Sequence, residues 1–338
     1  MSLAYNTSDA EVTQGVVYKK SQGHYGVCVN GHLIDCEISS RLRKQLEYPI
    51  AAPTSRRHRV LDVHEIRVID PIAIGDVVQF LRAGDGAGII TNVLPRRNQI
   101  ARQDPGPRPI VQVIAANIDY LVHVIASAQP APKWELLDRY LASAEKAEIS
   151  SLIVFTKSDL IKDNAVNQAI EMYRAVGYPT ILTSAETGQG IAELQNALRD
   201  KTCVFVGMSG VGKSTLLNAL QPELALRVNK ISRASGKGKH TTTHLEMFDF
   251  DFGNDCSLVT RVIDTPGLKY LTLWDIEGAQ LAEYFVEMQP YLGKCKFGAD
   301  CSHVHEPDCA VKRAVNAGAI SEQRYSSYLS IAKKMRAG

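Results

Sequence analysis

Four short motifs stand in an order that constrains this chain more than any other feature of its sequence. Residues 207–214 read Gly-Met-Ser-Gly-Val-Gly-Lys-Ser and match the phosphate-loop pattern G-x-x-x-x-G-K-[ST]. Asp264 to Gly267, Asp-Thr-Pro-Gly, follows where a loop that senses the metal and the γ-phosphate belongs. The base-reading signature at 156–159 and its companion at 184–185 precede the phosphate loop, although ordinary GTPases carry them last. The order predicts a circularly permuted GTPase.

The residues around the phosphate loop predict the strand, turn and helix that bind phosphates. Thr202 to Val206 is a short β-rich run, and a helical pattern begins at Ser214. A turn of this kind aims backbone N–H groups and a helix N-terminus at a phosphate. Lys213 would neutralise charge on the β- and γ-phosphates, and Ser214 would ligate Mg²⁺. We expect GTP or GDP to contact Gly207, Met208, Ser209, Gly210, Val211, Gly212, Lys213, Ser214 and Thr215.

The base-reading loop follows Ser151 to Phe155, which has the pattern of a buried strand. Ligands in parallel α/β sheets bind at the carboxyl ends of strands. A carboxylate at Asp159 can accept hydrogen bonds from guanine N1 and N2, which adenine cannot match. Thr156 replaces the usual Asn and keeps one hydroxyl for local bonding, so guanine preference rests on Asp159. The expected contacts outside the phosphate loop are Thr156, Lys157, Asp159, Ser184, Ala185, Asp264 and Gly267.

Composition indicates a globular chain with room for two or three domains. It has 338 residues and 45% hydrophobic content, no apolar run as long as a membrane span, and no signal-peptide pattern. Four of its seven cysteines are scattered, as in reduced cytoplasmic proteins. Residues 111–285 carry a net charge of −4, whereas residues 1–110 and 286–338 carry +3 each. We expect a cytoplasmic protein whose basic flanks can contact phosphate backbones.

The first part of the chain, residues 1–100, predicts a small β-barrel that binds RNA. Short β runs separated by glycine turns fill residues 11–95, and an oligonucleotide-binding (OB) barrel is the fold that pairs five strands with a nucleic-acid face. Two basic clusters favour RNA contact, with an ordinary solvated loop as the alternative. They contain Arg41, Arg43, Lys44, Arg56, Arg57 and Arg59. Residues 95–109, rich in proline, are typical of an interdomain linker.

The middle part, residues 110–285, alternates strand and helix patterns and predicts an α/β domain with a mostly parallel sheet. The expected strands are 118–125, 152–155, 180–183, 203–206 and 258–263, and the expected helices are 136–147, 166–176 and 191–198.

The last part, residues 286–338, carries the spacing Cys295-x5-Cys301-x-His303-x5-Cys309. Three thiols and one imidazole suit a closed tetrahedral zinc site without an open position, so the metal would be structural. His305 competes with His303 as the ligand, and three chance cysteines in a surface loop are the alternative to a site. Helices with basic residues are expected around 310–317 and 322–335.

Together, the barrel, the permuted Gly-x-Ser-Gly-Val-Gly-Lys-Ser motif and the Cys-x-His-x5-Cys cluster resemble the RsgA (YjeQ/YloQ) family of GTPases that depend on the small ribosomal subunit. The resemblance covers nearly the whole chain. It implies an α/β permuted GTPase domain flanked by an OB-type barrel and a zinc-binding helical domain. It also implies a cytoplasmic factor that binds the subunit and its rRNA late in maturation, where the subunit stimulates GTP hydrolysis. The sequence departs from the family at Thr156 and in the first zinc spacing, which has five intervening residues where four are expected.

The resemblance also suggests roles in the switch, residues 236–243. Thr242 stands where similar GTPases carry the threonine that binds Mg²⁺, with Thr241 as the fallback. Leu268 occupies the position of the water-orienting glutamine of Ras-like enzymes, and an apolar side chain cannot orient water. His240 is the best substitute, because similar proteins use a switch histidine; a solvated loop histidine is the alternative.

The switch is rich in glycine and lysine, and we expect it to be flexible. A flexible switch implies slow intrinsic hydrolysis of GTP until a partner orders it. We expect a monomer that works as a clamp, in which the position of the two RNA-binding flanks depends on the bound nucleotide. Two other functions stay open: a metal-trafficking GTPase that transfers metal through the Cys/His cluster, and a binding module with vestigial catalysis.

Overall fold

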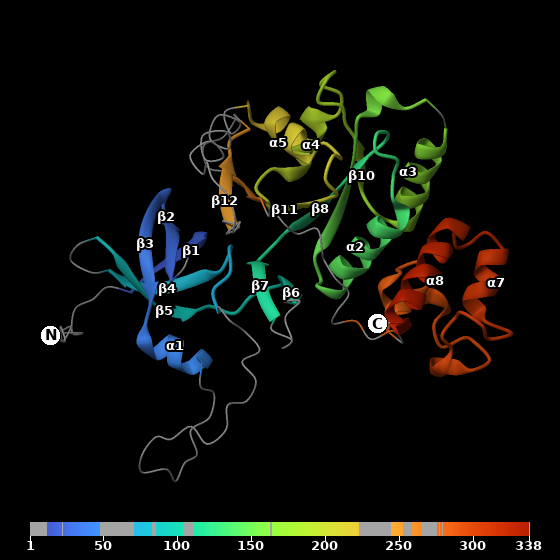
Figure 1. The fold of residues 1–338 in the computed structure, drawn as a ribbon, viewed down its shortest axis with the longest axis horizontal. Coiled ribbons are helices and arrows are strands. Elements are labelled where there is room, and N and C mark those ends of the chain that lie inside the picture. The colour runs from blue at the N-terminus through green and yellow to red at the C-terminus, as the bar shows by residue number, and fades with distance from the viewer. Residues whose placement is uncertain are drawn as a thin grey trace, which may run out of the picture. The chain divides into compact units, whose positions relative to one another are not determined.

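The computed structural model of the chain describes residues 12–21, 23–47, 71–82, 86–103, 111–162, 164–222, 245–252, 259–264, 276, 278 and 280–337. The chain divides into two compact units (Figure 1). The first comprises residues 1–118, 241–248 and 263–266, and the second comprises residues 119–240, 249–262 and 267–338. The division runs through the strands β12 (Leu245–Phe250) and β13 (Thr260–Asp264). The proposed boundaries of three domains stay a prediction.

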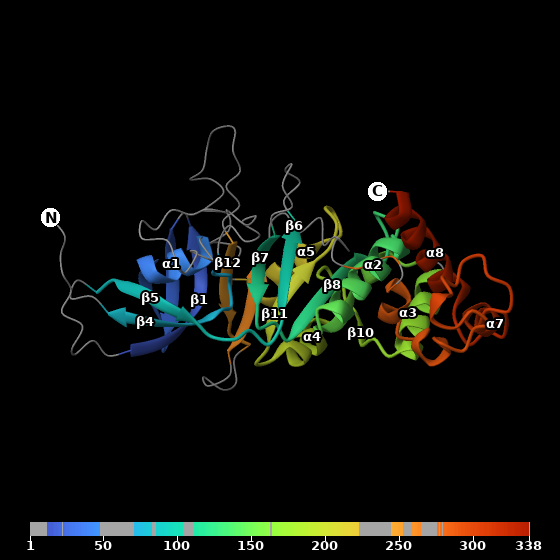
Figure 2. The same ribbon diagram turned by 90° about the horizontal axis from the view of Figure 1, so that it is seen from below.

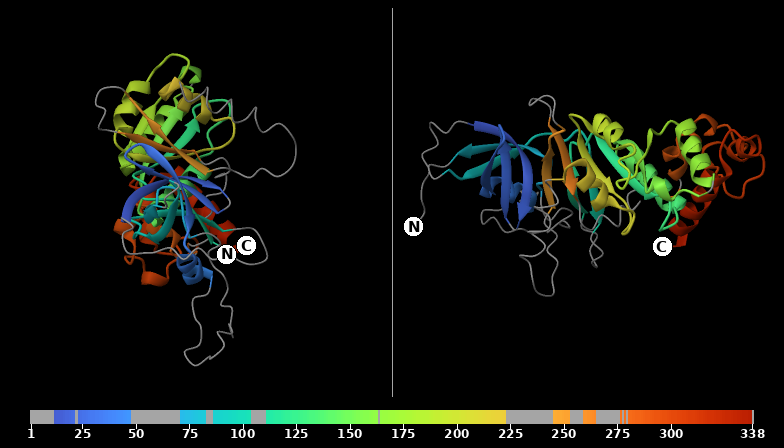
Figure 3. Two further views of the ribbon diagram at one scale, coloured as in Figure 1. Left: turned by 90° about the vertical axis from the view of Figure 1, so that its left-hand side faces the viewer. Right: turned by 90° about the horizontal axis from the view of Figure 1, so that it is seen from above.

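Five strands of the first unit close into a small barrel, which Figure 3 (left) views from the side of the blue and cyan strands. β1 pairs antiparallel with both β2 and β4, β2 with β3, and β4 with β5, while β3 and β5 run parallel and complete the ring. The helix α1 (Ser40–Glu47) follows β3. The strands are β1 (Val12–Ser21), β2 (His24–Val29), β3 (His32–Ile38), β4 (Val77–Arg82) and β5 (Gly88–Val93). The predicted five-stranded barrel is confirmed.

Apolar side chains from alternate strand positions fill this barrel. The fully buried ones include Val17, Val27, Val78, Phe80 and Ile90. Gly88 of β5 faces the same interior, where an added Cβ would lie 2.5 Å from the sulfur of Cys36 and 2.7 Å from the ring of Phe80. Any larger residue would push apart β3, β4 and β5, so the tight closure of the barrel depends on this glycine.

The segment expected to be a linker proves partly structured. Residues Gln99–Gln103 form β6, which pairs antiparallel with β7 (Val111–Ala116). Just before β6, the guanidinium of Arg96 donates hydrogen bonds of 2.7 and 2.8 Å to the fully buried carboxylate of Asp76. The linker interpretation was wrong here because local composition does not reveal a distant strand or ion-pair partner. The proline-rich residues 105–109 lie outside the described part.

In the second unit, four parallel strands run in the spatial order β10-β9-β8-β11. Their interior positions are almost entirely apolar and buried, as expected for a sheet covered on both faces. The helices α2 and α3 share one buried cluster with β9, while α4 and α5 lie next to each other (Figure 1). The strands are β8 (Tyr120–Ala126), β9 (Ser150–Thr156), β10 (Thr180–Leu182) and β11 (Thr202–Val206). The helices are α2 (Trp134–Lys146), α3 (Ala165–Val176), α4 (Ile191–Leu198) and α5 (Lys213–Leu220).

The C-terminal part of this unit packs against α2, beside which α8 lies in Figure 2. It begins with three single-turn 3₁₀ helices, η3 (Leu281–Tyr284), η4 (Gln289–Tyr291) and η5 (Gly298–Asp300), and continues with α7 (Ala310–Asn316) and α8 (Glu322–Ala337). The guanidinium of Arg324, fully buried, donates hydrogen bonds to Asp138 of α2 at 2.6 Å and to Glu287 at 2.7 and 2.9 Å. Among the described residues, no helix is long and apolar enough to cross a membrane.

Candidate nucleotide site and metal centre

The phosphate loop has the strand, turn and helix that its sequence predicts. All five residues of β11 are buried, residues 207–212 form the turn, and Lys213, Ser214 and Thr215 begin α5. Gly210 and Gly212 have φ of +84° and +93°, a left-handed backbone that favours glycine. A Cβ on Gly207 would lie 2.5 Å from the carbonyl oxygen of Val124. The glycine spacing therefore follows from backbone shape, and the loop opens onto the N-terminus of α5, where phosphates bind.

The base-reading loop is tied directly to the phosphate loop. Thr156, the last residue of β9, is 5% exposed and donates a 2.5 Å hydrogen bond from its hydroxyl to the carbonyl oxygen of Val211. Lys157 has a left-handed backbone, with φ of +57°, and its ammonium donates to the carbonyl oxygen of Gly210 at 2.9 Å and to that of Gln129. The hydroxyl that Thr156 retains in place of an amide thus holds two loops 55 positions apart in the sequence.

The third loop, after β10, supports the residue expected to read guanine. The hydroxyl of the buried Ser184 donates a 2.5 Å hydrogen bond to the carboxylate of Asp159, and it accepts one from the backbone N–H of Thr187 at 3.2 Å. Ser158 donates to the side-chain oxygen of Gln189 at 2.7 Å. Asp159 and Ala185 are exposed at this edge of the sheet. The carboxyl ends of β9, β10 and β11 therefore gather the base-reading residues and the phosphate loop into one site, as in other parallel sheets.

Several predicted residues lie outside the part of the chain that the structure describes. They include the switch residues His240, Thr241 and Thr242, the loop residues Gly267 and Leu268, and the basic residues Arg56, Arg57 and Arg59. Asp264 ends β13, and only its backbone is described, as is that of Lys44 in α1. Arg41 and Arg43 are exposed on α1.

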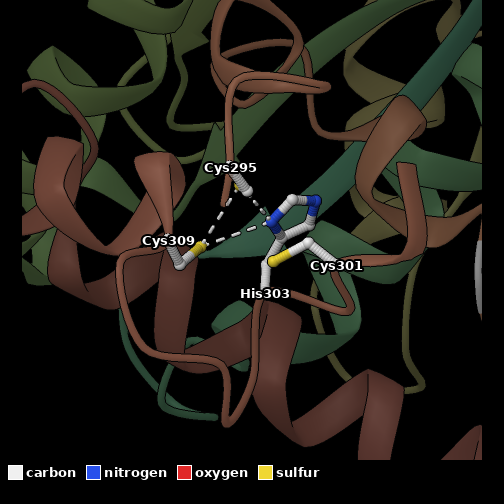
Figure 4. Close-up of side chains that lie close together, drawn as sticks. All are labelled: Cys295, Cys301, His303 and Cys309. Carbon is white, nitrogen blue, oxygen red and sulfur yellow. Dashed lines mark hydrogen bonds between the residues drawn. The ribbon is translucent and has the colours of Figure 1, made fainter. Parts of the chain in front are cut away.

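The predicted metal ligands come together in the C-terminal part (Figure 4). The ligand atoms of Cys295, Cys301, His303 and Cys309 all lie within 4.8 Å of one another, and none of these residues is more than 8% exposed. The sulfur of Cys295 lies 3.7 Å from that of Cys309, and His303 Nδ1 lies 3.5 and 3.4 Å from the same two sulfurs. Tetrahedral zinc with ordinary bond lengths places sulfurs about 3.8 Å apart and sulfur and nitrogen about 3.6 Å apart, so the donor set fits this ion.

The loop that carries His303 is held from two sides. The carboxylate of Glu306 accepts hydrogen bonds from the backbone N–H groups of Ser302 and Val304 at 2.9 and 3.0 Å. Burial would raise the pKa of Glu306, but these hydrogen bonds and that of the Ser302 hydroxyl lower it to about 2. From α8, the hydroxyl of Tyr325 donates to the carbonyl oxygen of His303 at 2.8 Å. His305 is exposed and lies outside the cluster, whereas His303 is part of it, in line with the preference for His303.

The sequence offered no local signal for several of these supports. Lys157 was predicted as a nucleotide contact, whereas its bonds to the loop carbonyls depend on residues far along the chain. Glu306 and Tyr325 were not predicted at all, because a carboxylate and a phenol of this kind look like ordinary surface residues until the fold brings them to the metal loop.

Comparison with known proteins agrees with this geometry. The model of the RsgA GTPase family matches residues 93–274. The chain belongs to the RsgA GTPase family. It is 37% identical over 300 residues to the small ribosomal subunit biogenesis GTPase RsgA of Saccharophagus degradans, covering 86% of this chain and 84% of that protein. It is 34% identical to the RsgA of Bacteroides fragilis, with 96% and 98% coverage.

The chain is also similar to solved structures over nearly its whole length. The crystal structure of YjeQ from Thermotoga maritima is 31% identical, with a TM-score of 0.73, and covers 97% of this chain and 100% of that one. That of YloQ, a circularly permuted GTPase, is 28% identical, with a TM-score of 0.69 and 99% and 98% coverage. The chain is therefore a GTPase of the RsgA fold, with an N-terminal five-stranded barrel, a permuted GTPase core and a C-terminal Cys3His cluster.

Proposed function

We propose that this RsgA-family GTPase hydrolyses GTP as a maturation factor of the small ribosomal subunit and that the subunit stimulates its turnover. The observation that carries the proposal is the tether of Thr156 to Val211, which assembles base loop and phosphate loop into one site despite their permuted order. The relatives above, which are named for biogenesis of the small ribosomal subunit, support the choice of partner.

Hydrolysis of GTP needs charge neutralisation and a positioned water more than covalent help from the protein. In our proposal Lys213 and the amides of residues 207–212 neutralise the phosphates. Ser214 and Thr242 would hold Mg²⁺, with Thr241 as the fallback and Asp264 acting indirectly. When bound there, Mg²⁺ would supply positive charge against the negative charge that develops on the phosphates.

The attacking water must also be positioned, and we assign this role to a residue that acts only when a partner orders it. Leu268 cannot orient water, so we propose His240 of the switch for this role. Lys237 and Lys239 precede it closely in the sequence, and rRNA phosphates that bind these lysines would order the histidine. The chain alone would then hydrolyse GTP slowly, and the subunit would accelerate it.

The Cys3His cluster supports a structural zinc ion. The four ligands are buried, all four positions of a tetrahedral ion have a protein donor, and the loop is fixed through Glu306 and Tyr325. A structural zinc site is closed by four protein ligands, whereas a metal-transfer site would need a ligand that an incoming protein can reach and displace. Burial of the cluster therefore favours ribosome maturation over the alternative of metal trafficking.

The partner surface would come from both ends of the chain. We propose an RNA-binding barrel in residues 1–100, the GTPase domain in 110–285 and a zinc-binding domain in 286–338. Exposed basic residues support contact with rRNA at both ends: Arg41 and Arg43 on α1, and Lys294 and Lys296 next to the metal cluster. The protein would act as a monomer in the cytoplasm.

The clamp can be tested by the affinity of the full chain for purified small subunits. Because only the γ-phosphate would order the switch, a non-hydrolysable GTP analogue should give tighter binding than GDP. By linkage, the subunit must favour the GTP-like state by the same factor. Equal affinities in the two nucleotide states would contradict a nucleotide-dependent clamp.

A further inference from the structure

The barrel strand β1 changes its antiparallel partner partway along its length. Its first half pairs with β4, whereas Lys19 and Lys20 pair with Glu246 and Leu245 of β12 (Figure 2). β2 pairs with both halves of β1, and its register shifts just before Lys19. Irregularities of this kind bend a strand and re-aim its side chains. One end of β1 therefore closes the barrel, and the other end carries a strand that follows the proposed switch in the sequence.

β12 leads to the residue expected to sense the metal. It stands beside β13 in the hydrogen-bonded sheet, and β13 ends at Asp264, the first residue of the Asp-Thr-Pro-Gly motif. Residues 241–248 and 263–266 belong to the same compact unit as the barrel. The barrel, the first part of β12 and the end of β13 thus form one unit, in which Asp264 ends the second strand beyond β1.

One side-chain contact fixes the register of β12 on β1. The ammonium of Lys19 forms an ion pair with the carboxylate of Glu246, which lies directly opposite in the register. The residue opposite Lys19 on the other side, in β2, is Gly26, which has no side chain. The side chain of Glu246 is 19% exposed and that of Lys19 is 52% exposed. A slip of β12 by one residue would turn Glu246 to the other face of the sheet and break the pair.

The neighbouring residues do not replace this contact. Met247, on the opposite face of β12, is 2% exposed, but apolar burial is non-directional and does not specify which residue of β1 lies opposite. The ammonium of Lys20 donates a 2.6 Å hydrogen bond to the carbonyl oxygen of Ile72, so it is engaged within the barrel. The pair between Lys19 and Glu246 is therefore the contact that makes the position of β12 depend on β1.

We propose that Lys19 and Glu246 are positioning residues for GTP hydrolysis. They hold β12, and through it the end of β13 at Asp264, in a register that the barrel sets. A partner that binds the barrel and steadies β1 also steadies the strand that ends at Asp264. The inference rests on the proposed function, because it explains how rRNA on the barrel raises turnover at the nucleotide site.

The test measures GTP turnover of the full chain alone and with saturating purified small subunits. Glu246→Gln and Lys19→Met each break the ion pair and keep a side chain of similar length. Each should lower the subunit-stimulated kcat about threefold, the scale of an ion pair that is partly open to solvent. Turnover without subunits and affinity for GDP should stay at their wild-type values. A wild-type stimulated kcat in Glu246→Gln would overturn the proposal.

A charge exchange separates positioning from direct RNA contact by Lys19. Lys19→Glu alone places like charges opposite each other, which destabilises a strand pair, and should lower the stimulated kcat further than Lys19→Met. Adding Glu246→Lys restores the pair with its charges exchanged and should bring kcat back to within about twofold of the wild type. If Lys19 acts by binding RNA, the double variant stays as low as Lys19→Glu, and the proposal is overturned. Glu37→Gln, which removes an exposed carboxylate of β3, is the control and should behave like the wild type.

Hydrogen exchange of the chain without subunits keeps this contact testable if the proposed function fails. Small subunits that do not stimulate the wild type would disprove the choice of partner but not the role of the ion pair. In Glu246→Gln the backbone amides of Ile263 and Asp264 should exchange about threefold faster than in the wild type, with the buried barrel residues Val27 and Phe80 unchanged. Unchanged exchange at Ile263 and Asp264 would overturn the positioning role.

Discussion

The hydroxyl of Thr156 donates a hydrogen bond to the carbonyl oxygen of Val211 across 55 positions of sequence. The ammonium of Lys157 donates a second hydrogen bond, to the carbonyl oxygen of Gly210, so the base loop is joined to the phosphate loop at two points. The permutation reverses the order of these two loops along the chain, but the loops still contact each other in the fold. The site depends on side-chain tethers rather than on sequence proximity.

Removal of that hydroxyl should weaken nucleotide binding. Thr156→Val keeps the shape of the side chain but leaves the carbonyl of Val211 without its partner, so GDP affinity should fall about five- to tenfold, the worth of one buried hydrogen bond. Thr156→Ser, which retains the hydroxyl, should bind like the wild type. Titration with a fluorescent GDP derivative measures both, and identical affinities for Thr156→Val and wild type would contradict the tether.

Asp159→Asn should relax nucleotide choice. The guanine edge loses a charged acceptor, and hydrogen bonds to charged groups contribute about 1.5–3 kcal/mol, so GTP affinity should fall by about tenfold or more. Preference for GTP over ATP should fall with it. Glu186→Gln removes an exposed carboxylate two residues after Ser184 and serves as the control. If wild type binds ATP as well as GTP in competition titrations, the assignment of the base loop is wrong.

Cys301→Ser should release the metal and open the C-terminal part. Binding of a structural ion is folding free energy for a segment of this kind, so residues from about 290 onward should lose their protection from hydrogen exchange. Nucleotide binding should persist. Cys28→Ser, in the barrel, should keep about one zinc per chain. Elemental analysis decides the matter: full zinc content in Cys301→Ser would rule out the proposed ligand set.

Arg324→Met should destabilise the packing of α8 on α2. The substitution leaves Asp138 and Glu287 buried without their cation, which costs about 3–5 kcal/mol for a broken buried ion pair. Lys334→Met removes a pair with Glu135 whose lysine is 64% exposed, and it should cost about 1 kcal/mol or less. Hydrogen exchange of the backbone amides of α8 reports both. If both variants lower the protection of α8 equally, the buried Arg324 network stabilises the packing no more than the exposed Lys334–Glu135 pair does.

Local patterns of the sequence predicted most of the elements that position the nucleotide. The apolar run from Leu152 to Phe155, followed at once by a polar loop, is a fully buried strand in any parallel sheet, and β9 confirms it. The glycines of the phosphate loop and the spacing of the cysteines are equally local. These features could be predicted because the backbone or the metal dictates them without reference to the rest of the fold.

Features that depend on distant partners could not be predicted. The linker interpretation of residues 95–109 rests on their proline content, and it misses β6 because the partner strand β7 lies beyond the proline-rich stretch. Arg324 lies in a basic helix and has the sequence context of a surface residue, but it is fully buried against a carboxylate 186 positions away. The roles of His240 and Thr242 stay predictions, since both lie outside the described residues.

The central claim is best tested by GTP turnover of the full chain with and without purified small ribosomal subunits, with large subunits as the control. We predict slow turnover alone and a rise of about 10²-fold on small subunits, the scale on which one positioned catalytic group acts. His240→Ala should still bind subunits but lose most of the rise. Turnover that is unaffected by small subunits, or equally raised by large ones, would contradict the account.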